Sequence, residues 1–393
     1  MKKIRALLIA DQRSFRNTEM INLLKRSGFD LDMMSSDSFH YLYRNIKQLF
    51  FFKNSDQFSS LASQLAGKYH LTIALGDVAL KLITDSSLTD DEKLELLPVC
   101  NKEGFRHICS KIALSEYLSL ANITTPAYKK LESWETLAEE VKSIGYPALL
   151  KIDYSGGGIG TFRLNSEIDI FNVPSHFKEQ PLLIQKYIEG SLIDLLAFFQ
   201  DGELICFSCS QSISNINGPY GPSKEKVYYS LNSIDSRISA ELSALGKALS
   251  AHGFCNITCI ECSSTKKRYY FEADMRPNDW INYPQHMRDD FALRVREYFI
   301  NGSVFDTNSI SGESTPIEYF FANPSRMNVV ELLTNRYNWL TYSNLPSLLL
   351  HWLSLLRFNP WESFKVLAVK YIKPRVHRRV WGILKSKTPV THY

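Results

Sequence analysis

Four glycines stand within five residues at Gly156-Gly157-Gly158-Ile159-Gly160, and this run is the first feature that suggests chemistry. Glycine has no side chain, so the backbone N–H groups of such a run can approach a polyphosphate closely. Lys151 precedes the run, and Thr161-Phe162-Arg163-Leu164, which alternates like a strand, follows it. The glycines are therefore predicted at the tip of a β-hairpin, with Lys151 on the strand before them.

Two other phosphate-binding motifs also use glycine-rich loops. A Walker loop ends in Gly-Lys-Ser/Thr, whereas Gly160 is followed here by Thr161-Phe162. A dinucleotide-binding fold places a helix directly after the glycines, where this sequence predicts a strand. A flap of strand, glycines and strand over phosphates remains, beside the alternative of an ordinary flexible turn.

Two carboxylates, Glu272 and Asp274, stand two residues apart at the predicted end of a strand, and Arg276 follows. Side chains at i and i+2 of a strand share a face. Hard cations such as Mg²⁺ are held by one or two carboxylates together with phosphate oxygens. An arginine beside them can neutralise a phosphoryl group during transfer. The alternative is a solvated strand end with an ordinary charge pair.

A third segment is an apolar strand with a polar end, Leu183-Ile184-Gln185-Lys186-Tyr187-Ile188-Glu189-Gly190. The backbone at such a strand end can offer N–H and C=O groups to the edge of a purine base. Taken in chain order, the three segments resemble the ATP-grasp superfamily over about residues 105–302. The resemblance also includes Lys111, which lies on a predicted helix ahead of Thr125-Pro126.

The resemblance implies a role for each matching residue. It implies that ATP is bound by Lys111, Lys151, Gly156, Gly157, Gly158, Ile159, Gly160, Gln185, Lys186, Tyr187, Ile188, Glu189 and Asp194. Glu272 and Asp274 would hold one or two Mg²⁺ ions, and Arg276 would stabilise the transition state that leads to an acyl phosphate. The implied enzyme is an ADP-forming carboxylate–amine ligase, in which an amine, or less often a thiol, captures the acyl phosphate.

The sequence departs from the family pattern at three positions. Gln185 replaces the usual glutamate of the adenine-binding hinge and keeps an amide oxygen as acceptor. Leu192 stands where an acidic residue often contacts the ribose, with Glu189 or Asp194 as substitutes. Thr258 stands where a further metal ligand is expected, so the site would hold its metals more weakly or hold one. Two alternatives stay open: an ATP-grasp kinase that phosphorylates a hydroxyl, and a nucleotide-binding scaffold with degenerate catalysis.

The elements around these residues predict an α/β plus α+β fold. Residues 1–104 alternate strand-like and helix-like runs, which predicts a small parallel α/β domain of the kind that precedes the ATP-grasp fold. Residues 105–325 are interpreted as a two-subdomain ATP-grasp fold with a large antiparallel sheet and a mobile flap subdomain at about 147–190. Residues 326–393 are predicted to form a helical, basic extension.

Some elements are predicted with specific boundaries. Ser133 is expected to cap a helix that runs to Ile144, and a second helix is expected over Ile108–Leu120. A hairpin is expected across Ser263–Lys267. The aromatic segment Phe39–Lys53 gives no clear pattern.

Charge is distributed unevenly along the chain. Residues 331–393 contain ten Lys/Arg and two Asp/Glu, a net charge of +8 within a total of +4. Apolar and aromatic residues occur at helical spacing in the same stretch, which is typical of a helix face packed on a core. The alternative is docking to an anionic membrane or to an acidic partner. The small total charge implies no nucleic-acid partner, so the expected partners are small-molecule carboxylate and amine substrates.

Seven cysteines in no regular framework indicate reduced thiols and a cytoplasmic protein rather than a disulfide-linked secreted domain. Cys206/Cys209 and Cys259/Cys262 each stand on a predicted strand, where residues i and i+3 point to opposite faces and cannot share a metal. The N-terminal apolar run is too short for a signal peptide. No stretch reaches the roughly 18 apolar residues of a membrane span. The expected location is the cytoplasm, or peripherally the inner face of a membrane.

Overall fold

The computed structural model describes residues 4–11, 14–37, 45–216, 218–231, 234–287, 289–302 and 318–322. Three sheets organise this part of the chain. The predicted extension at 326–393, and with it the docking hypothesis for residues 331–393, lies outside the described residues. None of the helices within the described ranges is long and apolar enough to cross a bilayer.

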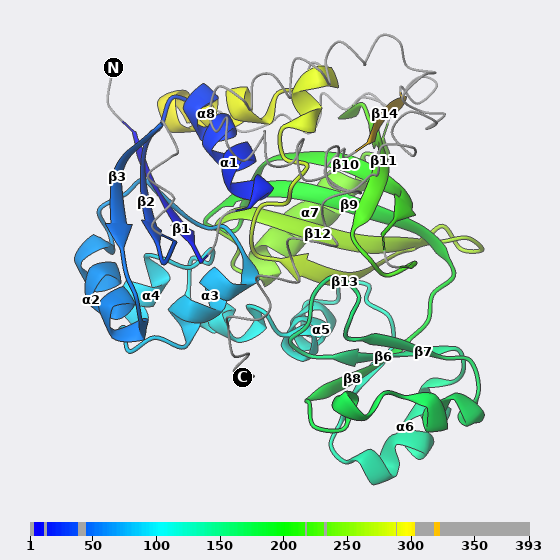
Figure 1. Ribbon diagram of the computed structural model, residues 1–393. Helices are drawn as coiled ribbons and strands as arrows, with labels where there is room; N and C mark the ends of the chain where they lie inside the picture. The colour runs from blue at the N-terminus through cyan, green and yellow to red at the C-terminus, as the bar shows by residue number, and fades with distance from the viewer. Residues whose placement is uncertain are drawn as a thin grey trace, which may run out of the picture.

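The first sheet is parallel, in the order β3-β2-β1-β4, as predicted for the N-terminal part of the chain (Figure 1). Its elements are β1 (Arg5–Ala10), α1 (Phe15–Arg26), β2 (Asp30–Ser35), β3 (Ile46–Phe51), α2 (Ser55–Leu65), β4 (Leu71–Ala74), α3 (Asp77–Thr84) and α4 (Asp90–Leu94). Strand β1 is buried from Ala6 to Ala10, as expected for a parallel sheet covered on both faces. Strand β3 occupies part of the segment that the sequence left without a clear pattern.

The second sheet is antiparallel and has six strands, in the order β13-β12-β9-β10-β11-β14. Its elements are β9 (Gly190–Gln200), β10 (Glu203–Asn215), β11 (Ser223–Tyr229), α7 (Arg237–Ala248), β12 (Gly253–Cys262), β13 (Arg268–Asp274), α8 (Phe291–Asn301) and β14 (Glu318–Ala322). The predicted large antiparallel sheet and the β12–β13 hairpin are both confirmed.

The third sheet is antiparallel, in the order β5-β8-β6-β7. It is preceded by the 3-10 helix η2 (Lys102–His107) and α5 (Lys111–Leu120), and its elements are β5 (Tyr128–Leu131), α6 (Leu137–Ile144), β6 (Ala148–Ile152), β7 (Thr161–Leu164) and β8 (Leu182–Lys186). Most of its buried apolar residues, from Leu131 to Ile184, form a cluster of their own. Figure 1 shows this sheet and α6 at the lower right, apart from the other two sheets. We refer to it as the flap sheet.

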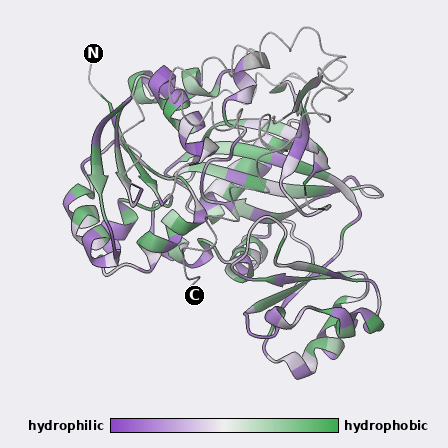
Figure 2. Cartoon of the chain, viewed as in Figure 1, coloured by the Kyte–Doolittle hydropathy of each residue, from purple (hydrophilic) through white to green (hydrophobic). Residues whose placement is uncertain are grey.

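The other two sheets share their hydrophobic cores. Leu7 of β1 belongs to the same cluster as Phe199 of β9, and Leu8 belongs to a second cluster with Phe198. Figure 2 shows hydrophobic residues along the strands of both sheets, while α2, which buries only one face, carries both colours. The shared core holds the end of β4 close to β13, where the candidate site lies.

Two predicted helix starts differ in detail. The chain turns helical directly after Ser133, but as the 3-10 helix η3 (Trp134–Thr136), and α6 follows from Leu137. The predicted cap is wrong, because the Ser133 hydroxyl donates to Glu135 and accepts no backbone N–H. The helix expected from Ile108 begins at Lys111, because Ser110 is its N-cap. The Ser110 hydroxyl accepts a hydrogen bond from the backbone N–H of Ala113. The second shift places Lys111 in the first turn of α5.

All seven cysteines are free. Cys206 packs into one hydrophobic cluster and Cys209 into the other, so the two side chains lie on opposite faces of β10, as predicted. Burial raises the pKa of Cys209 to about 12, which keeps that thiol protonated and unreactive.

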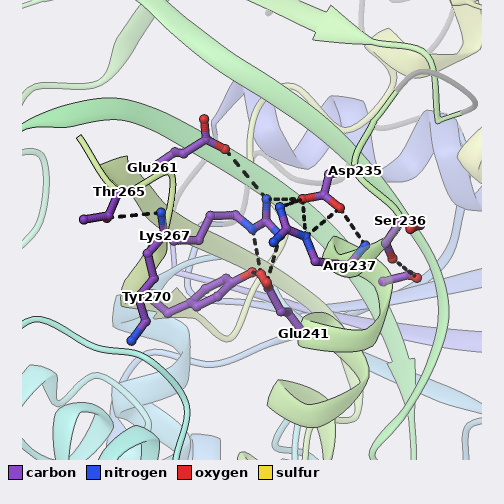
Figure 3. A network of polar contacts seen from close by, with 10 residues as sticks. Asp235, Ser236, Arg237, Glu241, Glu261, Thr265, Lys267 and Tyr270 are labelled. Carbon is purple, nitrogen blue, oxygen red and sulfur yellow. Dashed lines mark hydrogen bonds and ion pairs between the residues drawn. The ribbon is translucent and has the colours of Figure 1, made fainter. Parts of the chain in front are cut away.

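A network of polar contacts that includes Asp235, Glu241 and Tyr270 lies at the start of β13 (Figure 3). The Arg268 side chain is 3% exposed and donates two hydrogen bonds, of 2.7 and 2.8 Å, to the carboxylate of Glu241. It donates a third, of 2.9 Å, to Asp235, and the Tyr270 hydroxyl also donates to Glu241. This network fastens β13, which carries Glu272 at its other end, to helix α7 and the segment before it.

Replacing Arg268 with Met is expected to lower the free energy of unfolding by about 3 kcal/mol, because two partly buried carboxylates lose their cation. Urea denaturation measures the change. Arg237→Met is the matched control: Arg237 also pairs with Asp235, but its side chain is 72% exposed, so the loss should stay below about 1 kcal/mol. Equal losses in the two variants would contradict a supporting role for Arg268.

Candidate active site

A cavity of about 330 Å³ is lined by residues of both the flap sheet and the six-stranded sheet. Most of the residues that the sequence predicts to bind ATP form its walls: Lys111, Lys151, Gly156, Gly157, Gly158, Gln185, Lys186, Tyr187, Ile188 and Asp194. Glu272, predicted as a metal ligand, lines the same cavity. Segments more than a hundred residues apart in the chain therefore meet at one place. We call this the first cavity.

The remaining predicted residues lie outside the lining of the first cavity. Ile159 is 81% exposed at the tip of the glycine loop, and Gly160 packs against Ser155 so closely that a Cβ would lie 2.2 Å from its hydroxyl oxygen. Glu189 is exposed, and its carbonyl accepts a hydrogen bond from the N–H of Ser263. These three residues shape the loop and the strand end rather than the cavity wall.

Lys151 of β6 and Gln185 of β8 meet in the wall of the first cavity. The Lys151 ammonium donates a 2.7 Å hydrogen bond to the Gln185 amide oxygen and lies 4.5 Å from the centroid of the Phe271 ring. Burial lowers the pKa of Lys151 to about 8, although nearby Glu272 acts in the opposite direction. A buried ammonium whose charge is so weakly compensated favours the binding of an anion.

Lys111 supports the base of the glycine loop. Its ammonium donates hydrogen bonds of 3.0 and 2.6 Å to the carbonyls of Asp153 and Ser155. The Asp153 carboxylate in turn accepts from the Ser110 hydroxyl and from the N–H of Ile112. The first turn of α5 is thereby joined to the end of β6, where the loop begins.

Lys186 lines the first cavity, and its ammonium binds two backbone carbonyls. The ammonium donates hydrogen bonds of 3.1 and 3.0 Å to the carbonyls of Gly145 and Tyr146. These bonds fasten the end of β8 to the start of β6. Lys186 therefore contributes to the shape of the hinge segment.

A β-bulge in β13 turns two consecutive residues toward the first cavity. Thr258 pairs with Glu272 and Cys259 pairs with Tyr270, so Phe271 is the extra residue in β13. Bulges change the direction of the side chains that they carry. Phe271 and Glu272 both line the cavity, although strict alternation along a strand would put them on opposite faces. Sequence reasoning missed Phe271 for this reason.

Asp194 lies beside Thr258 in the six-stranded sheet, and Thr258 lies beside Glu272. One carboxylate oxygen of Asp194 accepts from the Thr258 hydroxyl at 3.1 Å, and the other pairs with Lys226 at 2.7 Å. Both side chains of that ion pair are at most 10% exposed. Sequence reasoning did not single out Lys226, since only the β10–β11 pairing brings it across the sheet.

Glu272 and Asp274 fit a hard cation. Burial and the charge of Asp274 raise the pKa of Glu272 to about 7, and burial also raises the pKa of Asp274. Asp274 pairs with Arg276 at 2.9 Å, whereas the Glu272 carboxylate makes no hydrogen bond or ion pair with any described residue. Within the described ranges no group of three or more His, Cys, Asp or Glu side chains joins them. Such a pair of carboxylates matches Mg²⁺ sites completed by phosphate oxygens and water.

A second cavity of about 300 Å³ adjoins the first. The two share Lys111, Ser155, Gly156, Gly157 and Glu272 in their walls. The second cavity is also lined by the beginning of α3, by Tyr154 and by Arg276. It therefore lies beyond the end of β4, the edge of a parallel sheet at which ligands commonly bind.

Arg276 bridges the two parts of the chain that line the second cavity. Its guanidinium donates hydrogen bonds of 2.5 and 2.9 Å to the two carboxylate oxygens of Asp77, the first residue of α3. Burial acts to raise the pKa of Asp77, but the charge and hydrogen bonds of Arg276, together with the charges of Arg16 and Lys111, outweigh it and the pKa is lowered. Sequence reasoning missed Asp77, whose position directly after a parallel strand was the available signal.

The glycine loop touches the β10–β11 connection. Gly158 has a φ of +78°, and a Cβ there would lie 2.4 Å from the Tyr220 carbonyl oxygen. Nearby, the Arg163 guanidinium lies 4.0 Å from the centroid of the Tyr187 ring. The loop is thus closed over the first cavity at a point where only glycine fits.

Gly158→Ala is expected to weaken ADP binding about tenfold, because the loop must retreat from Tyr220 and adopt another backbone conformation. Isothermal titration calorimetry with MgADP measures the change. Gly156→Ala is the matched control, since a Cβ at Gly156 would meet nothing within 4 Å. Similar affinities for the two variants would show that closure of the loop does not matter.

No family model matches the chain. A segment of 175 residues is 29% identical to the carbamoyl phosphate synthase large chain of Clostridium botulinum (strain Eklund 17B / Type B). This match covers 43% of the present chain and 16% of that protein. The chain therefore spans only a small part of the length of this curated relative.

Solved structures match most of the chain at low sequence identity. The biotin carboxylase domain of Hydrogenobacter thermophilus 2-oxoglutarate carboxylase, in complex with MgADP, ADP and bicarbonate, superposes with a TM-score of 0.56 at 16% identity. That match covers 76% of this chain and 70% of that one. L-amino acid ligase from Bacillus licheniformis gives a TM-score of 0.57 at 13% identity, covering 81% and 79%. Together with the sheet arrangement, these similarities show that the chain adopts the ATP-grasp fold.

Proposed function

We propose that this chain is an ATP-dependent ligase, which activates a carboxylate as an acyl phosphate for attack by an amine and releases ADP. The observation that supports the proposal most directly is the junction of two cavities at Lys111, Gly156, Gly157 and Glu272. Each has the size of a small-ligand pocket. A nucleotide in the first cavity would direct its terminal phosphate toward an acceptor in the second.

The side chains at the junction are suited to phosphoryl transfer, in which positioning and charge neutralisation supply most of the catalysis. Lys151 and Lys111 would neutralise the α- and β-phosphates, and the glycine loop would cover them. Glu272 and Asp274 would hold Mg²⁺, which neutralises phosphate charge when bound. Arg276 would neutralise the charge that develops as a carboxylate oxygen attacks the γ-phosphorus and ADP leaves.

The second step needs only an amine in the second cavity. The amine nitrogen would attack the acyl carbon, phosphate would leave, and the amine would lose a proton. Two of the similar structures support this direction of chemistry. One contains MgADP with bicarbonate, and another is an amino acid ligase.

ADP formation from ATP, measured with pooled carboxylates with and without pooled amines, tests the proposal. Hydroxylamine added in place of the amine converts an acyl phosphate to a hydroxamate, whereas the phosphate ester formed by a kinase does not react. Carboxylate-dependent hydroxamate would support the ligase, and a stable phosphorylated alcohol would support the kinase. ATP binding without turnover would favour the scaffold, for which Thr258 and Leu192 are the motivating observations.

We propose that the site binds a single Mg²⁺ ion. Both carboxylate oxygens of Asp194 are already engaged, one by the Thr258 hydroxyl and the other by Lys226, so neither Asp194 nor Thr258 is free to bind a second ion. The titration of Mn²⁺ in the presence of ADP, followed by electron paramagnetic resonance, counts the bound ions. We also propose the domain boundaries near residues 104 and 325, with the flap at about 147–190. The separate hydrophobic cluster of the flap sheet supports that part of the proposal.

The contact of residues 331–393 with an anionic membrane or an acidic partner stays a prediction, motivated by the net charge of +8 in that stretch. Co-sedimentation of the full chain and of residues 1–330 with liposomes that contain anionic lipid tests it. Equal partitioning of the two would end the hypothesis.

A further inference from the structure

The wall of the second cavity has a polar part and an apolar part. The polar part is the boundary with the first cavity, where Lys111 and Glu272 lie. The apolar part includes Leu80 of α3, Leu114 of α5 and Met275, which follows β13. All three residues are at most 4% exposed and belong to the same hydrophobic cluster. This part of the cavity wall is therefore the surface of a hydrophobic core.

Two exposed side chains extend the apolar part of the wall. Val78 of α3 is 52% exposed and Tyr154 is 44% exposed, and both line the second cavity. Lys81 follows Val78 by three residues, so the two share one face of α3. The Lys81 ammonium lies 5.4 Å from the centroid of the Tyr154 ring. Tyr154 therefore lies against the face of α3 that carries Val78, and the two offer apolar surface to the same ligand.

The polar side chains on this side of the second cavity do not favour an anion. Burial lowers the pKa of His107 to about 4 and raises the pKa of Cys109 to about 12, so both are uncharged at neutral pH. The pKa of Asp77 is lowered, so that carboxylate stays ionised. Asp77 directly precedes Val78 on α3. An anionic group of a ligand that reached α3 would therefore be repelled.

We propose that the acceptor is a monocarboxylate with an apolar chain. Its carboxylate would lie beside Arg276, near the boundary with the first cavity, and its chain would pack on Leu80, Val78 and Tyr154. The proposal rests on the proposed ligase function and specifies the class of carboxylate that it activates. A chain that leaves water for this wall gains the free energy of burying apolar surface. A carboxylate at the far end of the same chain would lose its hydration and lie near Asp77.

The test measures the formation of hydroxamate from ATP, hydroxylamine and a carboxylate, with Mg²⁺ present. Valerate and glutarate have chains of equal length and differ only in a terminal methyl or carboxylate. For the wild type, kcat/KM is expected to rise about fourfold with each methylene from acetate to valerate, the effect of burying one methylene. Glutarate is expected to give a kcat/KM at least about 100-fold below that of valerate, because its second carboxylate must lose water without gaining a cation.

Val78→Lys brings an ammonium to the point where the end of the chain would lie. It is expected to shift the ratio of kcat/KM for glutarate over valerate at least about tenfold toward glutarate. The affinity for MgADP should not change, since Val78 does not line the first cavity. Leu293→Lys is the matched control, because Leu293 of α8 is also 52% exposed and lines neither cavity. It should leave the ratio unchanged, and a thermal melt of each variant reports its folding.

Each outcome has a distinct meaning. A preference for valerate that Val78→Lys weakens and Leu293→Lys leaves intact would support the proposal. Equal or better use of glutarate by the wild type would overturn it and leave the ligase function intact. A ratio in Val78→Lys equal to that of the wild type would overturn it as well. If no carboxylate gives hydroxamate, the proposed function fails, and the proposal fails with it.

Discussion

Glu272→Gln is expected to lower ATP-dependent turnover at least about 100-fold, the order of loss seen when a preorganised charge at a reacting phosphate or oxyanion is removed. Glu272 lies where the two cavities meet, and its carboxylate forms no hydrogen bond or ion pair with a described side chain. Glutamine preserves the shape of the side chain but is a poor ligand for a hard cation. Steady-state ADP formation measures the loss.

The same substitution has a second expected effect, on stability. Because burial raises the pKa of Glu272 to about 7 from its ordinary value of 4.5, the ionised carboxylate destabilises the ligand-free fold. The destabilisation is fully present above pH 7 and absent below pH 4.5, where the group is protonated in both states. The glutamine variant should therefore melt no lower than the wild type at pH 8, and its advantage should vanish toward pH 4.5.

Glu203→Gln is the matched control, since that carboxylate lies on β10 with a side chain 63% exposed. It should leave both turnover and the melting temperature unchanged. Glu272→Gln with turnover close to that of the wild type would refute the assignment of Glu272 to the metal. A melting temperature of Glu272→Gln far below that of the wild type at pH 8 would refute the claim that the ionised Glu272 carboxylate destabilises the ligand-free fold.

Arg276→Lys is expected to lower turnover by about 10²- to 10³-fold while the affinity for ADP changes less than about twofold. Lysine keeps the positive charge, but its ammonium cannot make the two parallel hydrogen bonds that a guanidinium makes with a carboxylate or a phosphate. Arg276 lines only the second cavity, so a nucleotide confined to the first should bind as before. Turnover assays and calorimetry with MgADP measure the two quantities.

The variant Asp77→Asn distinguishes a catalytic role of Arg276 from a structural role in its contact with α3. Asp77 accepts both hydrogen bonds from Arg276, so Asp77→Asn weakens the contact without removing the guanidinium. If Arg276 acts on the transferring phosphoryl group, Asp77→Asn should cost less than about tenfold in turnover, and Arg276→Lys should be as harmful in that background as in the wild type. A purely structural arginine would instead give equal losses in the single variants and no further loss in the double variant.

Several parts of this site were predictable from short segments of sequence. The glycine run marked the flap because its conformational freedom and lack of side chains are local properties. The hairpin around it was predictable because strand alternation in Thr161–Leu164 is visible in four residues, and β6 and β7 do pair there. Glu272 and Asp274 were found because their spacing puts them on one side of a strand, and both line the second cavity.

Other residues could be found only once the chain had folded. Asp77 meets Arg276 across 199 positions in the sequence, and Lys226 meets Asp194 only through the order of strands in the six-stranded sheet. Phe271 enters the cavity because of a bulge, which breaks the alternation that a sequence pattern assumes. Strand order, register and bulges depend on contacts between distant segments, and no local preference encodes them.

The glycine loop and its surroundings show the same division. The composition of a glycine run predicts a flexible turn whose backbone can approach a phosphate closely. The contact of Gly158 with Tyr220 and the hydrogen bond between Lys151 and Gln185 depend instead on how distant segments pack together. The amide of Gln185 illustrates the difference most clearly. Its residue type is a property of the sequence, but the direction in which its amide points is determined by a lysine on the neighbouring strand, because an ammonium can only donate.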